Sequence, residues 1–148
     1  MNKKDFFSKA LAAVGTVLVW LPLLAPLILG VISYVKDGVF RFDYLMPAEL
    51  FLLVLIGGGL LVWAAQRSGA YLAPISLGMV VAVIALIAAQ ATAVVTGLAS
   101  GETAVGGWQW ALVLLLLALY WLAVAFTGVL AIALLLGLFG TKRPRFEQ

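Results

Sequence analysis

The chain has 148 residues, of which 66% are hydrophobic and 10% are charged, and its formal net charge is +3. A soluble domain has about a quarter of its residues charged, so this composition excludes a water-soluble globule. The absence of cysteine and histidine excludes disulfides, thiol redox chemistry, haem ligation by imidazole and the usual zinc sites. We therefore expect no cofactor and no metal site.

Four apolar runs, each about 20 residues or longer, predict an all-α integral membrane protein, a four-transmembrane-helix bundle. The expected helices cover residues 10–35, 48–66, 72–99 and 108–139. With short basic tails at residues 1–9 and 140–148, they form a single membrane domain over residues 1–148. The first run is too long for a signal peptide and has no small-residue cleavage site after it, so we expect it to be retained.

The first expected helix carries Pro22 and Pro26 one turn apart, on a stripe of mostly small residues that includes Gly15, Gly30 and Ser33. Each proline removes a backbone donor, which predicts a bend where a neighbouring helix covers the freed carbonyl. A static kink is the simpler interpretation of this pair. A hinge or a gap for a ligand is the functional interpretation.

The loop before the second expected helix concentrates charge. Lys36, Arg41, Asp43 and Glu49 form a candidate outer-face site for a lipid headgroup or an ion. Pro47 and Glu49 also suit the start of a helix. Proline is tolerated at the first helical position, which needs no backbone donor, and the first turn of a helix favours a carboxylate. An ordinary mixed-charge surface loop is the plainer interpretation.

Small residues predict the packing faces of the second and third helices, because helices in lipid associate mainly through close backbone approach. The second helix contains Gly57, Gly58 and Gly59, which we interpret as a packing surface for the third helix or for a second copy. A flexible joint in a gate is the alternative. The third helix has small residues at heptad spacing: Gly78, Ala82, Ala85, Ala89, Thr92, Thr96 and Ala99.

Gln90 is the polar side chain inside the spans that is hardest to satisfy. We expect its amide to form an interhelical hydrogen bond to Tyr120 or Trp121 of the fourth helix. Trp121 is expected to point its indole into the bundle, where it needs an acceptor. The functional alternative is a site for ligand or polar contact at Gln90, Thr92, Thr96, Tyr120 and Trp121.

The basic residues predict the orientation. Seven of them fall on one side of the predicted membrane: Lys3, Lys4, Lys9, Arg67, Lys142, Arg143 and Arg145. The other side has only Lys36 and Arg41, so the positive-inside rule places both termini in the cytoplasm, in a plasma or inner membrane. Because the basic clusters flank apolar runs, they indicate topology and not a nucleic-acid partner.

The sequence leaves three classes of function open. No ionisable residue lies centrally in a span, which argues against proton-driven antiport, and no nucleotide or nucleophile motif is present. The favoured prediction is a non-catalytic accessory, scaffold or regulatory component acting through helix packing. Its partners would be membrane lipids, other membrane proteins or a second copy in a homodimer. The alternatives are a component of a transporter or channel for a neutral or lipid-like solute, and an outer-leaflet lipid-headgroup enzyme using Glu49 or Asp43.

Overall fold

The computed structural model describes residues 3–37, 50–103 and 106–140, and these form helices and turns without any strand. The helices are α1 (Lys3–Asp37), α2 (Phe51–Ser68), α3 (Leu72–Val95) and α4 (Trp108–Phe139). All four are long and apolar enough to cross a membrane. The all-helical architecture with four candidate membrane spans, predicted from the sequence, is therefore confirmed for the described residues.

The bounds of three helices differ from the prediction, while α4 covers the expected range. α1 includes basic residues from Lys3 onward and continues to Asp37, so it is longer than predicted at both ends. Leu50 is the N-cap of α2, and residues 48 and 49 lie outside the described part of the chain. α3 ends at Val95 because Gly97 adopts a left-handed φ of +71°, which an α-helix cannot continue through.

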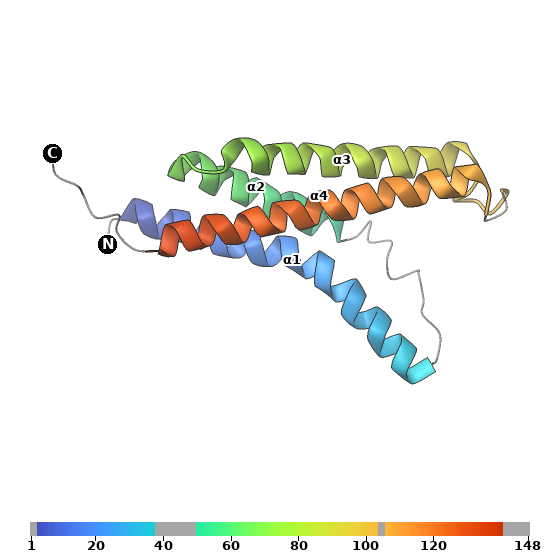
Figure 1. Cartoon of the computed structure of the whole chain (residues 1–148), viewed down its shortest axis with the longest axis horizontal. Coiled ribbons are helices and arrows are strands. Elements are labelled where there is room, and N and C mark those ends of the chain that lie inside the picture. The colour runs from blue at the N-terminus through green and yellow to red at the C-terminus, as the bar shows by residue number, and fades with distance from the viewer. Residues whose placement is uncertain (1–2, 38–49, 104–105, 141–148) are drawn as a thin grey trace.

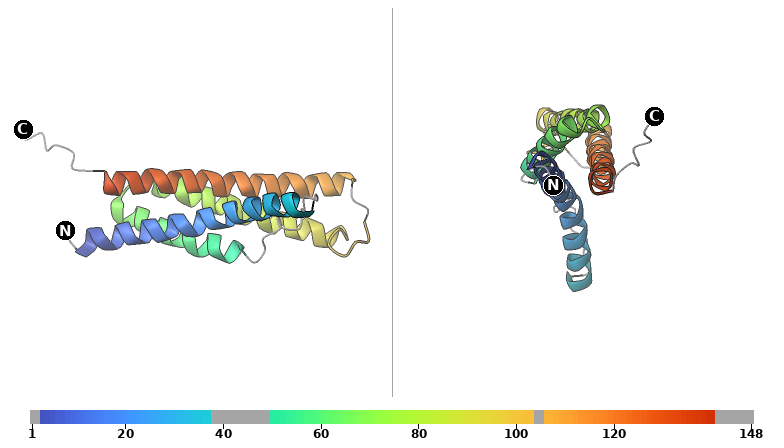
Figure 2. Two further views of the ribbon diagram at one scale, coloured as in Figure 1. Left: turned by 90° about the horizontal axis from the view of Figure 1, so that it is seen from below. Right: turned by 90° about the vertical axis from the view of Figure 1, so that its left-hand side faces the viewer.

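The helices pack as two close pairs, α1 with α2 and α3 with α4. α4 also packs against α1, and a smaller contact joins α2 to α3. The start of α1, the turn between α2 and α3, and the end of α4 lie at one end of the bundle (Figures 1 and 2). The turn between α3 and α4 lies at the opposite end, so neighbouring helices in the order α2, α3, α4 run antiparallel.

α1 bends near its middle, and its second half diverges from the other three helices (Figure 1). Pro22 and Pro26 lie inside this helix and are both buried. The bend follows from the missing backbone donors of the two prolines. Beyond the bend α1 exposes large apolar side chains, at Leu27, Ile28, Leu29, Val31, Ile32, Tyr34 and Val35. We call this segment, residues 27–35, the α1 arm.

Glycine-to-glycine contact sets the spacing of α1 and α2. A Cβ added to Gly57 would lie 2.8 Å from the Leu18 Cβ and 3.0 Å from the Gly15 carbonyl oxygen. A Cβ added to Gly15 would lie 2.9 Å from the Gly57 carbonyl oxygen. Each glycine therefore packs directly on the backbone of the other helix, at a separation that leaves no room for a side chain.

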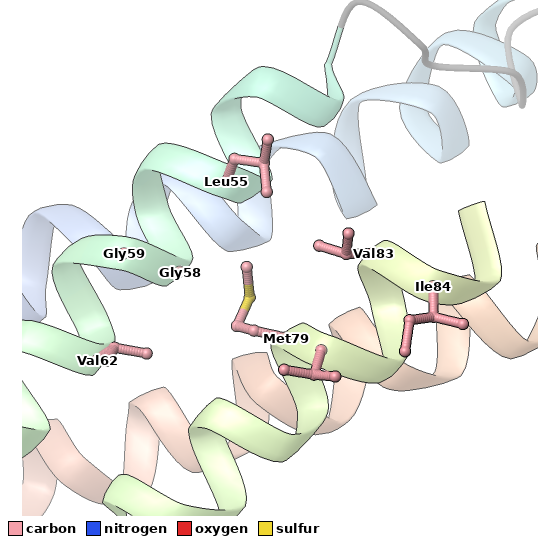
Figure 3. A pocket seen from close by; sticks show the side chains of 8 residues that line it. Leu55, Gly58, Gly59, Val62, Met79, Val83 and Ile84 are labelled. Carbon is pink, nitrogen blue, oxygen red and sulfur yellow. The ribbon is translucent and has the colours of Figure 1, made fainter. Parts of the chain in front are cut away.

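The three consecutive glycines of α2 face three directions, because successive residues are turned by about 100° around a helix. Gly58 is buried beneath the flexible thioether of Met79 on α3, beside a groove of about 370 Å³ between the two helices (Figure 3). Gly59 is exposed, and an added Cβ would meet no atom within 4 Å. Gly57 and Gly58 thus contact neighbouring helices, whereas packing of Gly59 against a second copy stays a prediction.

The small residues of α3 lie against α4. Gly78, Ala82, Ala85 and Ala89 are all buried, whereas Ala99 lies beyond the helix and is exposed. A Cβ at Gly78 would collide with the hydroxyl of Thr127, which is completely buried. The same principle of close approach therefore operates in both helix pairs.

We predict that Gly57→Ala lowers the free energy of unfolding by about 1–3 kcal/mol, because the added methyl must separate α1 from α2. Gly59→Ala is the matched control, since it changes the neighbouring residue by the same group in open space. The control should be neutral or slightly stabilising, because alanine favours a helix more than glycine does. SDS titration in mixed micelles measures the free energy of unfolding of both variants. An equal change for Gly57→Ala and Gly59→Ala would contradict the prediction.

Candidate functional site

Threonine hydroxyls within the helices are satisfied by their own helix. Each donates to the carbonyl oxygen four residues earlier, a common arrangement for threonine in apolar helices. The distances are 2.7 Å for Thr16 to Ala12, 2.8 Å for Thr92 to Ala88, 2.6 Å for Thr96 to Thr92 and 2.9 Å for Thr127 to Ala123. Thr92 and Thr96 therefore have no hydroxyl proton left to offer to a ligand.

Gln90 differs from the threonines. It is exposed on α3 and forms no hydrogen bond with another residue of the described chain. The expected bond to Tyr120 or Trp121 is not formed, because Gln90 lies near the α3–α4 turn, at the level of Val113 and Leu117. The sequence places those aromatic residues further along α4, deeper in the bundle.

A cavity of about 300 Å³ lies between α3 and α4 beside Gln90, and we call it the α3–α4 cavity. Its other walls come from apolar residues of both helices and of the turn after α3, including Trp110 of α4. Thr92, Thr96, Tyr120 and Trp121 do not line it. Of the predicted ligand-contact group, Gln90 alone lines the α3–α4 cavity.

Tyr120 and Trp121 belong to an aromatic cluster with Phe51 at the start of α2. The Tyr120 ring lies edge-on to both neighbours, with centroids 6.3 Å from Phe51 and 6.4 Å from Trp121. Tyr120 is buried, whereas Trp121 is only half-buried. These contacts join α4 to α2, which makes the cluster part of the packing of the bundle.

Trp20 of α1 is the tryptophan whose indole points into the bundle. Its Nε1–H donates to the carbonyl oxygen of Gly128 on α4 over 3.2 Å, and its ring covers that glycine. The sequence predicts this role for Trp121, which shares a helix face with Gly128. The sequence signal is the same for Trp20 and Trp121, because each is a tryptophan deep in an apolar helix whose N–H needs an acceptor. The sequence does not show which helix faces Gly128.

Two cations lie at the end of the bundle that holds the start of α1. Lys9 Nζ is 5.0 Å from the ring centroid of Phe139, and Arg67 Cζ is 5.9 Å from that of Phe7. These cation–π contacts link α1 to the ends of α4 and α2. Both cations thus lie against aromatic rings at this end of the bundle.

The candidate outer-face site cannot be assembled from the described residues. Lys36 lies exposed in the last turn of α1, but Arg41, Asp43 and Glu49 lie outside the described part of the chain. Pro47, proposed with Glu49 to start the second helix, is outside it as well. Among the residues that are described, no group of three acidic, histidine or cysteine side chains is placed to hold a metal ion.

We predict that Trp20→Phe lowers the free energy of unfolding by about 1 kcal/mol, because it removes the bond to Gly128 while keeping an aromatic ring in place. Trp63→Phe is the control, since Trp63 is half exposed on the outside of α2. SDS titration of both variants against the parent chain measures the difference. A loss at Trp63 as large as that at Trp20 would contradict the role of this bond.

Comparison with known proteins assigns no family to the chain. No family model matches it, and no curated protein or solved structure matches it significantly. The function proposed below is therefore inferred from the residues and their geometry.

Proposed function

We propose that the chain is an integral protein of a plasma or inner membrane, with both termini in the cytoplasm. The length and composition of the four helices support insertion. Lys9 and Arg67 support the orientation, because they lie together at the end that holds the start of α1 and the end of α4. On this orientation, the turn between α3 and α4, with the exposed Glu102, faces outward.

Within the membrane, the chain acts as a non-catalytic accessory or scaffold component that holds another membrane protein through helix contacts. The observation that carries this proposal is the α1 arm. Half of a long apolar helix leaves its own bundle at a double-proline bend and presents exposed apolar side chains. Such a projecting helix offers a neighbouring protein a row of large apolar side chains that its own bundle leaves exposed.

The α3–α4 cavity supports the alternative, a transporter or channel component for a neutral or lipid-like solute. Its apolar walls and single amide suit a small apolar molecule with one polar group. The second alternative, an enzyme acting on outer-leaflet headgroups, depends on Asp43 and Glu49, so no described geometry supports it. We prefer the accessory role because the α1 arm is a large feature that a solute site does not explain.

We predict that the tagged chain, extracted from its native membrane in mild detergent, carries a defined second protein that mass spectrometry identifies. The double variant Ile28→Ala, Ile32→Ala should lose that protein, because both side chains are exposed on the α1 arm. The matched control is Leu122→Ala, Val129→Ala, which removes exposed side chains from α4.

Two results would contradict the accessory role. One is recovery of this chain without any other protein across several mild detergents. The other is retention of the same second protein by the α1-arm variant at the level of the α4 control, which would place the contact elsewhere.

A further inference from the structure

The carboxamide of Gln90 lies at a depth where its hydrogen bonds are difficult to satisfy. Gln90 is five residues before the end of α3 at Val95, about 7 Å along the axis. Trp110, a residue suited to the membrane interface, lines the same cavity two residues after the start of α4. Gln90 is therefore about one helical turn inside the apolar layer, exposed on the surface of the bundle.

An amide in this position needs a partner that lipid cannot supply. Its side chain has two donor hydrogens and one acceptor oxygen, whereas acyl chains have neither. Leaving such a group unpaired in an apolar medium is unfavourable, because nothing replaces the hydrogen bonds that it forms with water. Thr92 of α3 and the C-cap residue Thr96 each donate to the carbonyl oxygen four residues earlier, whereas no hydrogen bond joins Gln90 to another described residue.

The surface around Gln90 has the shape of a helix contact. Ile87, Ala91 and Val94 are exposed beside it, with spacings of four and three residues that place them on one face. Ala91 is small enough for a second helix backbone to approach closely. A hollow of about 500 Å³ follows this face from Phe51 of α2 to Val94.

We propose that this face of α3 binds a second copy of the chain in a two-fold dimer, with the two Gln90 amides hydrogen-bonded to each other. A carboxamide is self-complementary, because the N–H of each group can donate to the carbonyl oxygen of the other. A two-fold interface places the same residue of both copies together at the same depth. A second copy thus supplies the required partner by symmetry, and the contact is separate from that of the α1 arm.

Cysteine cross-linking tests this dimer directly, because the chain contains no cysteine. Ala91→Cys introduces a single thiol on the proposed interface. Leu115→Cys is the matched control, because Leu115 is exposed on α4 at the same level of the bundle. Oxidation in liposomes at a high lipid-to-protein ratio should give a covalent dimer with Ala91→Cys and only monomer with Leu115→Cys.

Adding Gln90→Met to Ala91→Cys keeps a side chain of similar length and removes the amide. Loss of hydrogen bonds worth about 1–2 kcal/mol should lower dimer formation about tenfold. Three results would overturn the proposal: no dimer with Ala91→Cys, equal cross-linking with Leu115→Cys, or undiminished dimer with Gln90→Met. The cross-linking result does not depend on the outcome of the pull-down, because the dimer is proposed on α3 and the contact with a partner protein on the α1 arm.

Discussion

The close approach of α1 to α2 at Gly15 and Gly57 is the contact on which the rest of the bundle depends. In the membrane proposed for this chain, lipid is as apolar as the helices, so burying more leucine or valine gains little. Attraction between helices then comes from dispersion between surfaces that fit. Two glycines that pack on each other's backbone give the closest fit that an α-helix allows. Because this contact sits in the first half of α1, it anchors that half beside α2 and leaves the α1 arm beyond the prolines to diverge.

The other contacts extend this arrangement around the bundle. Met79 fills the space above Gly58 between α2 and α3, Gly78 accommodates the Thr127 hydroxyl between α3 and α4, and Trp20 bonds to Gly128 between α1 and α4. Threonines that bond to their own helix keep these faces free of unpaired donors. The α1 arm and the outer face of α3 at Gln90 are two of the surfaces that stay outside this arrangement. The proposed partner protein and the proposed second copy are assigned to these two surfaces.

Composition and apolar run length were sufficient to predict four helices without strands, and the bounds of α4 were predicted to the residue. The heptad of small residues in α3 indicated which face would be buried, because that signal depends on one helix alone. Contacts between helices were predicted less well. Gly59 and Gln90 face outward, and the indole that donates to another helix is that of Trp20 and not that of Trp121. Each of these features depends on how one helix is rotated relative to another. Of the charged residues in the predicted outer-face site, all except Lys36 lie outside the described residues. This site therefore stays a prediction.

A double-mutant cycle at Gly15 and Gly57 tests most directly whether backbone contact between glycines holds α1 to α2. Gly15→Ala and Gly57→Ala insert methyl groups into the same contact, so their effects on the free energy of unfolding should deviate from additivity by at least about 0.5 kcal/mol. Gly15→Ala and Gly78→Ala change different helix pairs, and their effects should add within about 0.5 kcal/mol. Simple additivity for Gly15 with Gly57, measured by SDS titration of the purified chain, would contradict a shared contact at the centre of the bundle.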